Sequence, residues 1–502
     1  MTGAMQWRPL KALLGGAFDV PDTIDVADIT LDSRNVRPGS VFLACRGRTQ
    51  HGLAHAREAA AAGARAILWE PSPGVSPPAL DPQVLLVAVP ELHAQVGYIA
   101  DRFFAAPSAK LTVAGITGTN GKSTCAWLLA DALSRCGRPA AYFGTLGHGR
   151  IGALRGTAFT TPDAVTLQRW LAEEVAAGTR AVAMEVSSHA LDQQRCNGVR
   201  FQAAAFTNLT RDHLDYHGDM DSYAAAKARL FDWPRLQLRV VNVDDPLWRE
   251  MAQRMRDQEG LWVTSRRQET SLPARACFVR ATALRAGVDG LQLQIESSAG
   301  SAQLRSPLLG EFNADNLLTV LALLLGLGVE LGAACEALAQ CRAPAGRMET
   351  LGGGDLPLAV VDYAHTPDAL QKALSALRVH TPGRLWCVFG CGGERDTGKR
   401  AAMGGIAARL ADHVVITDDN PRSEDPAAIA RAILDGMPRA DRAEVIHDRA
   451  AAIAGALARA QPGDTVLIAG KGHEDVQQIG GQRLPFNDLQ VARAALGTRS
   501  AA

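Results

Sequence analysis

The stretch that decides the fold is LTVAGITGTNGKST, residues 111–124. Its apolar first part, Leu111–Ile116, predicts a buried strand, and the Ala- and Leu-rich residues 125–133 predict a helix. A strand, a glycine-containing turn and a helix N-terminus form a cradle in which backbone N–H groups and the helix dipole favour an anion. The stretch departs from the usual G-x-x-x-x-G-K-[ST] phosphate loop, because Ile116 stands where the first glycine is expected.

This loop is the predicted site for the phosphates of a nucleotide. The expected contacts are Gly118, Thr119, Asn120, Gly121, Lys122, Ser123 and Thr124. Lys122 would reach the outer phosphates, and the hydroxyls of Ser123 and Thr124 could bind Mg²⁺. A chance Gly-Lys-Ser turn is the alternative, but the flanking strand and helix argue against it.

Further apolar runs predict an α/β fold. The strand candidates are Val84–Val89, Ala181–Val186, Ala203–Phe206, Leu358–Val361, Leu385–Phe389, His413–Thr417 and Val466–Ala469. Such runs between helical segments are typical of parallel sheets covered on both faces. Pro-containing segments near residues 105 and 342 suggest three domains: 1–105, 106–342 and 343–502. The central one is expected to be a P-loop-type parallel-sheet ATPase domain, and the C-terminal one to be Rossmann-like.

Composition restricts the class of protein. The 502 residues carry 52 basic and 52 acidic side chains, so no basic excess points to nucleic acid. The nine cysteines include no C-x-x-C pair, which argues against a disulfide framework or a structural zinc site. The N-terminal residues lack the features of a signal peptide, and the apolar run 317–329 is too short to span a bilayer. A cytoplasmic protein is expected.

A second polar cluster predicts a metal site. Glu185 ends a strand candidate, and carboxylates and imidazoles crowd the segment Phe206–Gly218 after another. Side chains at the carboxyl ends of parallel strands face the crevice where ligands bind, and carboxylates suit Mg²⁺. A polar surface loop would have the same composition.

The motifs together resemble the Mur ligase family, whose superfamily includes the folylpolyglutamate synthases. The resemblance rests on G-I-T-G-T-N-G-K-S-T (115–124), M-E-V-S-S-H-A-L (184–191), N-L-T-R-D-H-L-D-Y-H-G (208–218) and A-A-K-x-x-L-F (225–231). It implies two Mg²⁺ ions, with Ser123, Glu185 and His213 among the ligands. It also implies that Lys227 is carbamylated, which would turn a cation into a carboxylate-like metal ligand. Lys122, Glu185, His213 and Lys227 are thus expected to have catalytic roles.

The resemblance also assigns a site for a UDP-muramyl dipeptide. It implies contacts from Leu31, Ser33, Arg48, Thr49, Gln50, Thr160, Thr161, Ser187, Gln193 and Arg195. Phe159 replaces an Asn that often precedes the Thr pair in such enzymes, so no side-chain contact is expected there. Arg195 suits a diphosphate or a carboxylate because its planar guanidinium can bind either in a bidentate manner.

Further contacts to ATP and to an amino acid are expected toward the C-terminus. Asn313, which could instead be only a helix N-cap, Arg347 and Asp362 match ATP contacts of the family. The D-N-P-R segment, 419–422, resembles that of family members that add meso-diaminopimelate. Arg422 would clamp the distal carboxylate, while Gly470 and Glu474 would hold the distal amine. The full set implied is Arg395, Asp419, Asn420, Pro421, Arg422, Gly470 and Glu474.

The resemblance implies an ATP-dependent amide ligase of peptidoglycan synthesis. It would add meso-2,6-diaminopimelate to the D-Glu of UDP-N-acetylmuramoyl-L-Ala-D-Glu through an acyl phosphate, and a monomer is expected. A lysine-adding muramyl ligase and a folylpolyglutamate synthase-like ligase are the alternatives within the family. A P-loop switch is disfavoured because no N-K-x-D motif is present, and an inactive scaffold because the matched positions are intact.

Overall fold

The computed structural model describes residues 7–47, 49–267, 273, 275–394 and 396–500. The chain forms two compact units, Met1–Lys122 with Gly137–Val240, and Ser123–Cys136 with Val241–Ala502. The first boundary lies inside the predicted phosphate loop, and the last one lies inside β12 (Leu238–Asn242). The predicted domain limits at 105/106 and 342/343 stay predictions.

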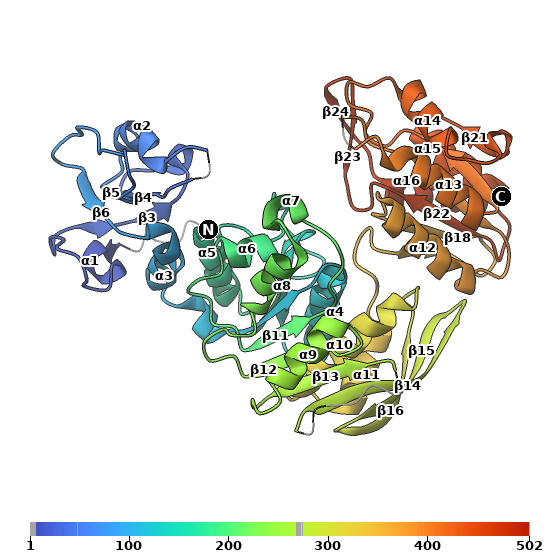
Figure 1. The fold of residues 1–502 in the computed structure, drawn as a ribbon, viewed down its shortest axis with the longest axis horizontal. Helices are drawn as coiled ribbons and strands as arrows, with labels where there is room; N and C mark the ends of the chain where they lie inside the picture. Colours follow the sequence, from blue (N-terminus) through green and yellow to red (C-terminus); the bar gives the residue numbers. More distant parts are fainter. Residues whose placement is uncertain (1–6, 48, 268–272, 274, 395, 501–502) are drawn as a thin grey trace. The chain divides into compact units, whose positions relative to one another are not determined.

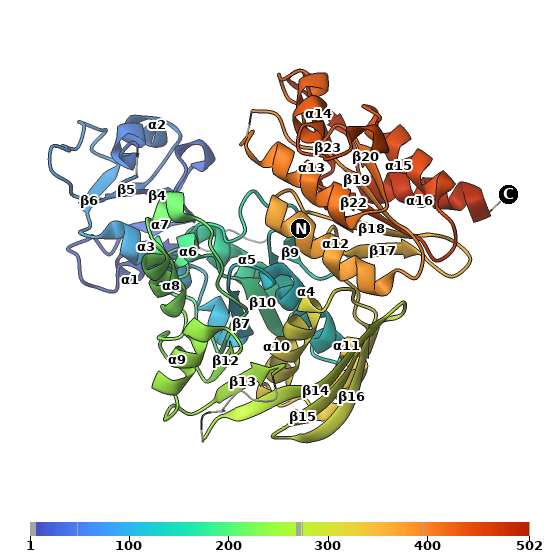
Figure 2. The same cartoon turned by 45° about the vertical axis from the view of Figure 1, so that its right-hand side comes forward.

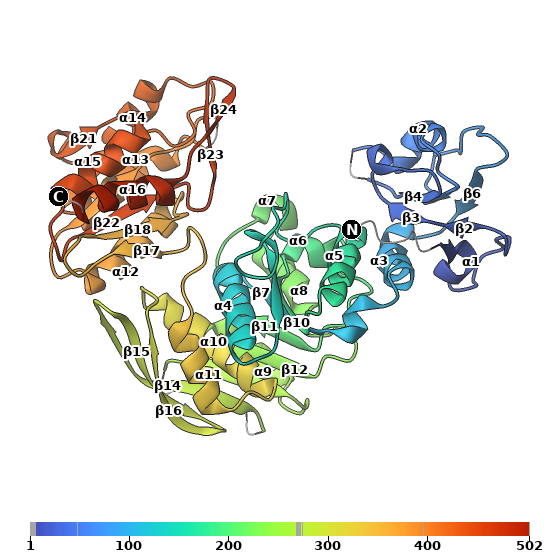
Figure 3. The same ribbon diagram turned by 180° about the vertical axis from the view of Figure 1, so that it is seen from behind.

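The first unit begins with a small α/β layer. A four-stranded parallel sheet has the order β3 (Asp28–Thr30), β4 (Ser40–Ala44), β5 (Ala66–Trp69), β6 (Leu85–Ala88). Around it lie β1 (Arg8–Pro9), β2 (Asp25–Val26), α1 (Leu10–Leu13), α2 (Ala56–Ala61) and α3 (Leu92–Phe103). One apolar core joins α1, α3 and this sheet to the start of α5 (Ala164–Ala176). Helices α3 and α5 lie side by side (Figures 1 and 3).

The second sheet of this unit carries the phosphate loop. Its strands have the order β11 (Ala203–Phe206), β7 (Thr112–Thr117), β10 (Ala181–Glu185), β8 (Ala140–Gly144), β9 (Gly147–Gly149). All neighbours are parallel except β8 and β9, so the carboxyl ends of β7, β10 and β11 meet at one edge. The other helices are α6 (Ser188–Asp192), α7 (Leu214–His217) and α8 (Met220–Ala228).

The second unit contains α4 (Lys122–Arg135) from Ser123 onward. With it lie α9 (Pro246–Arg254), β13 (Leu261–Ser265), β14 (Cys277–Gly287), β15 (Gly290–Ser297), β16 (Gly300–Ser306), α10 (Phe312–Gly326) and α11 (Leu331–Gln340). Helices α4 and α10 pack together (Figure 2), and the Cys125 thiol lies 3.4 Å from Asn316 Oδ1. Strands β14, β15 and β16 form antiparallel hairpins.

The C-terminal part of this unit is a doubly wound sheet. Its order is β17 (Glu349–Gly352), β18 (Leu358–Asp362), β22 (Thr465–Ala469), β19 (Leu385–Phe389), β20 (His413–Ile416), β21 (Ala443–Val445). Helices α12 (Pro367–His380), α13 (Lys399–Leu410) and α14 (Pro426–Leu434) supply the core on one face. Helices α15 (Arg449–Arg459) and α16 (Asp488–Ser500) cover the other, and β23 (Val476–Ile479) pairs with β24 (Gln482–Pro485). The Rossmann-like prediction for this part is confirmed.

Three further expectations concern single features. All nine cysteines lie among the described residues and none forms a disulfide. In the described part of the chain, no helix is both long and apolar enough to cross a membrane. The interpretation of Asn313 as an N-cap is wrong, because α10 starts at Phe312 with Glu311 as its N-cap. Asn313 lies inside the helix, where its side chain donates 2.7 Å to Leu309 O.

Candidate active site

The phosphate loop leaves β7 in a conformation that requires glycine. Gly118 has a φ of +145°, and a Cβ there would lie 1.9 Å from Thr207 Oγ1. The Thr119 and Asn120 N–H groups donate to Asn208 O (2.8 Å) and Asn208 Oδ1 (3.0 Å). The segment after β11 therefore supports the loop from behind, which fixes its path.

Two lysines converge on one carbonyl of this loop. Lys122 Nζ donates to Gly118 O at 2.9 Å, and Lys227 Nζ donates to the same oxygen at 2.8 Å. Lys227 is buried and lies 4.4 Å from the centre of the Tyr223 ring. Burial, together with the charge of Lys122, lowers the pKa of Lys227 to about 6. Two residues predicted from separate motifs, Lys122 and Lys227, are thus brought together.

Glu185 is buried at the end of β10. Its Oε1 accepts hydrogen bonds from the Tyr142 hydroxyl (2.5 Å) and from Thr145 N (2.9 Å). The Thr145 hydroxyl lies 3.0 Å from Thr160 Oγ1, and Thr161 Oγ1 donates 2.9 Å to Glu185 O. The predicted metal ligand and the predicted threonine pair therefore belong to one network.

His213 lies in an aromatic cluster next to this region. It has a φ of +52°, and its ring is 4.8 Å from that of His189 and 6.1 Å from that of Tyr223. His217 approaches Ser188 Oγ at 3.0 Å, and burial lowers the pKa values of His189 and His217. In the part of the chain that the structure describes, no three or more His, Cys, Asp or Glu side chains form a group that could hold a metal.

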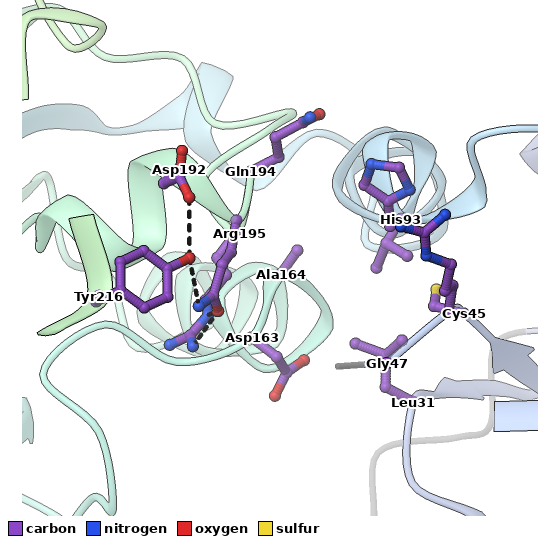
Figure 4. Close-up of a pocket in the computed structure, with 13 residues that line it drawn as sticks. Leu31, Cys45, Gly47, His93, Asp163, Ala164, Asp192, Gln194, Arg195 and Tyr216 are labelled. Atoms are coloured by element: carbon purple, nitrogen blue, oxygen red, sulfur yellow. Dashed lines mark hydrogen bonds between the residues drawn. The ribbon is translucent and has the colours of Figure 1, made fainter. Parts of the chain in front are cut away.

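A pocket of about 630 Å³ opens within the first unit (Figure 4). It is lined by Leu31, Cys45, Arg46, Gly47, His93, Val96, Asp163, Ala164, Asp192, Gln193, Gln194, Arg195 and Tyr216. Three of the predicted residues, Leu31, Gln193 and Arg195, are among them. Asp163 caps α5 by accepting from Val165 N and Thr166 N, which gives the T-T-P-D-A stretch a structural role as well.

The Arg195 side chain is held in this pocket by its neighbours. It donates to Gln193 Oε1 and, at 3.1 Å, to Thr161 O. Gln193 Nε2 donates to the Tyr216 hydroxyl at 3.0 Å, and that hydroxyl donates to Asp192 Oδ2 at 2.9 Å. Figure 4 shows three members of this chain, Asp192, Tyr216 and Arg195, along one wall of the pocket.

The remaining residues predicted for the UDP-sugar site lie elsewhere or have other partners. Ser33 is buried and donates 3.0 Å to Glu58 Oε2, and Ser187 caps α6. Thr49 and Gln50 are exposed, while Arg48 lies outside the described residues.

In the second unit, the residues predicted for ATP are buried (Ser123, Thr124, Asn313) or half-buried (Arg347, Asp362) near helix and strand ends. Ser123 and Thr124 are buried in the first turn of α4, and Asn313 is buried in α10. Asp362 ends β18 and accepts from Met348 N at 2.8 Å, and burial raises its pKa. Arg347 lies 5.1 Å from the Tyr363 ring, and its Nε is buried without a hydrogen bond among the described residues.

The D-N-P-R segment follows β20 and meets the segment after β22. Asn420 Nδ2 donates 2.9 Å to Glu474 Oε2. Gly470 has a φ of +118°, and a Cβ there would lie 2.5 Å from Asp419 Oδ2. Arg422 donates 2.6 Å to Gly393 O, and its own backbone pairs with Gln478 and Gly480. Six of the seven residues predicted for the amino acid are thus placed at one sheet edge, and Arg395 lies outside the described residues.

Sequence reasoning missed several polar residues of these sites. Tyr216 stands inside the quoted motif 208–218, and Lys471 follows Gly470 directly, so their positions were a signal in the sequence. Asp192 and His93 carried no such signal. His93 lines the pocket, and its Nδ1 lies 2.7 Å from the buried Glu70 carboxylate.

Comparison with known proteins identifies the family. The model described as the Mur ligase family catalytic domain matches residues 25–104. The Mur ligase middle domain matches residues 116–324, and the Mur ligase glutamate ligase domain matches residues 346–472. The chain belongs to the Mur ligase family, and the predicted three-domain α/β fold class is confirmed.

The similar proteins share a more particular name. A UDP-N-acetylmuramoyl-L-alanyl-D-glutamate–2,6-diaminopimelate ligase from Pseudomonas aeruginosa is 50% identical over 94% of this chain and 95% of its own. One from Chromobacterium violaceum is 48% identical over 94% of each chain. A solved structure of an enzyme with this name has a TM-score of 0.74 and 35% identity, covering 99% of this chain and 100% of its own.

Proposed function

We propose that the chain is an ATP-dependent ligase that adds meso-2,6-diaminopimelate to UDP-N-acetylmuramoyl-L-Ala-D-Glu in peptidoglycan precursor synthesis. The observation that carries this proposal is the 50% identity, over nearly the full length of both chains, to a ligase named for that substrate pair. The D-N-P-R loop and the pocket that contains Arg195 are consistent with it.

We assign the phosphates of ATP to Gly118–Thr124 and further ATP contacts to Asn313, Arg347 and Asp362. The N-terminus of α4 and the glycine-dependent turn favour an anion. Lys122 now folds back onto Gly118 O and Thr119 O, and its ammonium would turn to the outer phosphates when nucleotide binds.

We assign Mg²⁺ binding to Ser123, Glu185, His213 and a carbamylated Lys227. Hard oxygen donors such as a hydroxyl and a carboxylate fit this ion. An unmodified lysine does not, but its lowered pKa favours the neutral amine that reacts with CO₂. When bound, the two ions would neutralise charge on the phosphates and on the reacting carboxylate.

We assign the UDP-muramyl dipeptide to the pocket in the first unit and to the residues near it. The contacts proposed are Leu31, Ser33, Arg48, Thr49, Gln50, Thr160, Thr161, Ser187, Gln193 and Arg195. The fixed guanidinium of Arg195 is suited to an anionic group of this ligand.

We assign diaminopimelate to Arg395, Asp419, Asn420, Pro421, Arg422, Gly470 and Glu474. Arg422 would bind the distal carboxylate, and Glu474 would bind the distal amine. A site that pairs both polar groups rejects analogues that lack one of them, because its own groups would then stay unpaired.

The reaction proposed has two steps. The γ-carboxylate of D-Glu attacks the γ-phosphorus of ATP, which forms an acyl phosphate and releases ADP. The neutral amine of diaminopimelate then attacks the acyl carbon, the bond from that carbon to the phosphate oxygen breaks, and inorganic phosphate leaves. The nitrogen gives up one proton to the surrounding water as the amide forms. The chain contributes Lys122, which would offset phosphate charge, and two binding sites that hold the reactants in position.

Phosphate release tests this function. With ATP and UDP-N-acetylmuramoyl-L-Ala-D-Glu, release is expected only when diaminopimelate is added, and much less with lysine. Release that does not depend on an amino acid would refute the ligase assignment. Equal rates with lysine would refute the role given to Arg422, and a lysine-adding ligase would be the better description.

A further inference from the structure

Lys471 lies next to the residues proposed to bind diaminopimelate, and the function proposed above gives it no role. Lys471 follows β22, and its side chain is 0% exposed. An ammonium taken out of water is costly unless it is paired and hydrogen-bonded. The hydrogen-bond partners of Lys471 therefore indicate why its side chain is buried.

Lys471 forms a closed triangle with two residues proposed to bind diaminopimelate. Its Nζ donates to Asn420 Oδ1 at 3.0 Å and to Glu474 Oε2 at 2.9 Å. Asn420 Nδ2 donates to the same Glu474 oxygen at 2.9 Å, and Gln478 N donates to Asn420 Oδ1 at 2.9 Å. The Asn420 amide has three hydrogen-bond partners and the Glu474 carboxylate has two, so neither can turn without losing a bond.

Glu474 is the member of the triangle that reaches the surface. Its side chain is 31% exposed, whereas Lys471 is fully buried. Both hydrogen bonds go to Oε2, and Oε1 has no hydrogen-bond partner among the described residues. The Glu474 carboxylate is thus held through Oε2, and Oε1 can accept a hydrogen bond from a ligand.

The charges around Glu474 favour its ionised form. Burial alone would raise the pKa of Glu474, but the hydrogen bond and charge of Lys471 outweigh it and keep the pKa low. Beneath the triangle lie buried Asp419 and the fully buried pair of Arg449 and Asp488. Burial raises the pKa of Asp419, against the opposing charges of Arg449 and Lys471.

We propose that Lys471 is a positioning residue for the amino-acid substrate: it fixes the Glu474 carboxylate so that Oε1 accepts from the distal ammonium of diaminopimelate. This inference rests on the function proposed above. Lys471 itself does not touch the substrate. It acts through Glu474 and keeps Asn420 in the orientation that supports the same carboxylate.

The test compares two substrates in Lys471→Met, a change that removes the ammonium and keeps the length of the side chain. The substrates are meso-diaminopimelate and 2-aminopimelate, which keeps the distal carboxylate but lacks the distal amine. The KM for diaminopimelate should rise roughly 10- to 100-fold, the effect of losing one hydrogen bond to a charged group. The KM for 2-aminopimelate and the kcat with both substrates should change little, because the contact affects binding alone.

A matched control makes the same change on the surface of the same unit. Lys372→Met removes an exposed pair with Asp368 on α12 and should leave both KM values unchanged. If thermal unfolding shows that Lys471→Met does not fold, Lys471→Gln is used, and the same selective loss is expected.

Three results would overturn the inference. An equal rise of KM for both substrates would mean a general distortion of the site, and an unchanged KM for diaminopimelate would mean that Glu474 needs no such support. Failure of both variants to fold would assign Lys471 a purely structural role. Wild-type protein without diaminopimelate-dependent phosphate release would instead refute the proposed function itself, whatever the variants do.

Discussion

Replacing Tyr216 by Phe should weaken the binding of UDP-N-acetylmuramoyl-L-Ala-D-Glu. The hydroxyl lies between two side chains on the pocket wall, accepting from Gln193 Nε2 at 3.0 Å and donating to Asp192 Oδ2 at 2.9 Å. Gln193 in turn accepts from the Arg195 guanidinium. Without the hydroxyl, Gln193 can rotate, and Arg195 loses part of the support that aims it into the pocket.

The expected magnitude follows from the bonds that are lost. A hydrogen bond to a charged group contributes about 1.5–3 kcal/mol, and one between neutral groups about 0.5–1.5 kcal/mol. Only part of this reaches the ligand, because Arg195 keeps its bond to Thr161 O at 3.1 Å. We expect a loss of about 1–2 kcal/mol, which is a rise in KM for the UDP substrate of roughly 5- to 30-fold.

The assay is phosphate release at saturating ATP and diaminopimelate with the UDP substrate varied. Tyr98→Phe is the matched control, because Tyr98 is 45% exposed on α3 and does not line the pocket. The KM for ATP should stay near its wild-type value in both variants. An unchanged KM for the UDP substrate in Tyr216→Phe, or an equal rise in Tyr98→Phe, would refute the reasoning.

Three further predictions concern other parts of the chain. Arg422→Ala should lower kcat/KM for diaminopimelate roughly 10- to 100-fold. The slow reaction with lysine should be unchanged, since lysine has no distal carboxylate. An equal loss with lysine would contradict the role given to Arg422. The pKa of Lys227 is lowered to about 6, chiefly by burial, so its neutral amine prevails above that pH and is lost as the pH falls through it. Bicarbonate should therefore restore the activity of CO₂-depleted enzyme at neutral pH but not well below pH 6. A ¹³C carbamate signal should be present in the wild type and in the control variant Lys110→Met, and absent in Lys227→Met. Activity that does not depend on CO₂ would argue against carbamylation. Asp488→Asn should lower the free energy of unfolding by about 3–5 kcal/mol in urea titrations, because it leaves the fully buried Arg449 charge without its partner at 2.7 Å; a loss below 1 kcal/mol would count against this account.

Buried parallel strands could be predicted well from the sequence. The expected run Ala203–Phe206 is β11, and Leu385–Phe389 is β19, residue for residue. Both are buried along their whole length, so every position had to be apolar and the run stood out. The strand before the phosphate loop differs from the prediction by one residue at each end.

Elements with another pattern were missed. The hairpins of β14, β15 and β16 alternate between buried and exposed positions, so they contain no continuous apolar run. Helix α11 was not recognised either, although it lies just before the boundary proposed near residue 342. The alternative interpretation of Asn313 as only an N-cap is wrong because α10 already begins at Phe312, and the Asn313 side-chain amide donates back to Leu309 O, before the helix.

Some residues of the candidate sites could likewise be predicted from the sequence, and others could not. Residues inside long motifs, such as Lys122, Glu185 and Asn420, were found because family resemblance carries them together. Residues that support these from other segments were not assigned a role, even where a motif contains them, as with Tyr216, because their partners are neighbours only in the folded chain. Tyr216 supports Gln193 from 23 positions away, and Lys471 supports Asn420 from 51 positions away.

The contacts between the D-N-P-R loop and the segments around it limit how the amino-acid preference can be changed, by design or in evolution. Asn420 depends on Lys471, Glu474 and Gln478, and Gly470 must lack a side chain so that Asp419 can approach. A loop transplanted alone from a lysine-adding homologue would leave Lys471 buried opposite mismatched neighbours. The two segments, residues 419–422 and 470–478, therefore have to change together. Exchanging the preference for diaminopimelate against one for lysine should require both segments to be grafted at once.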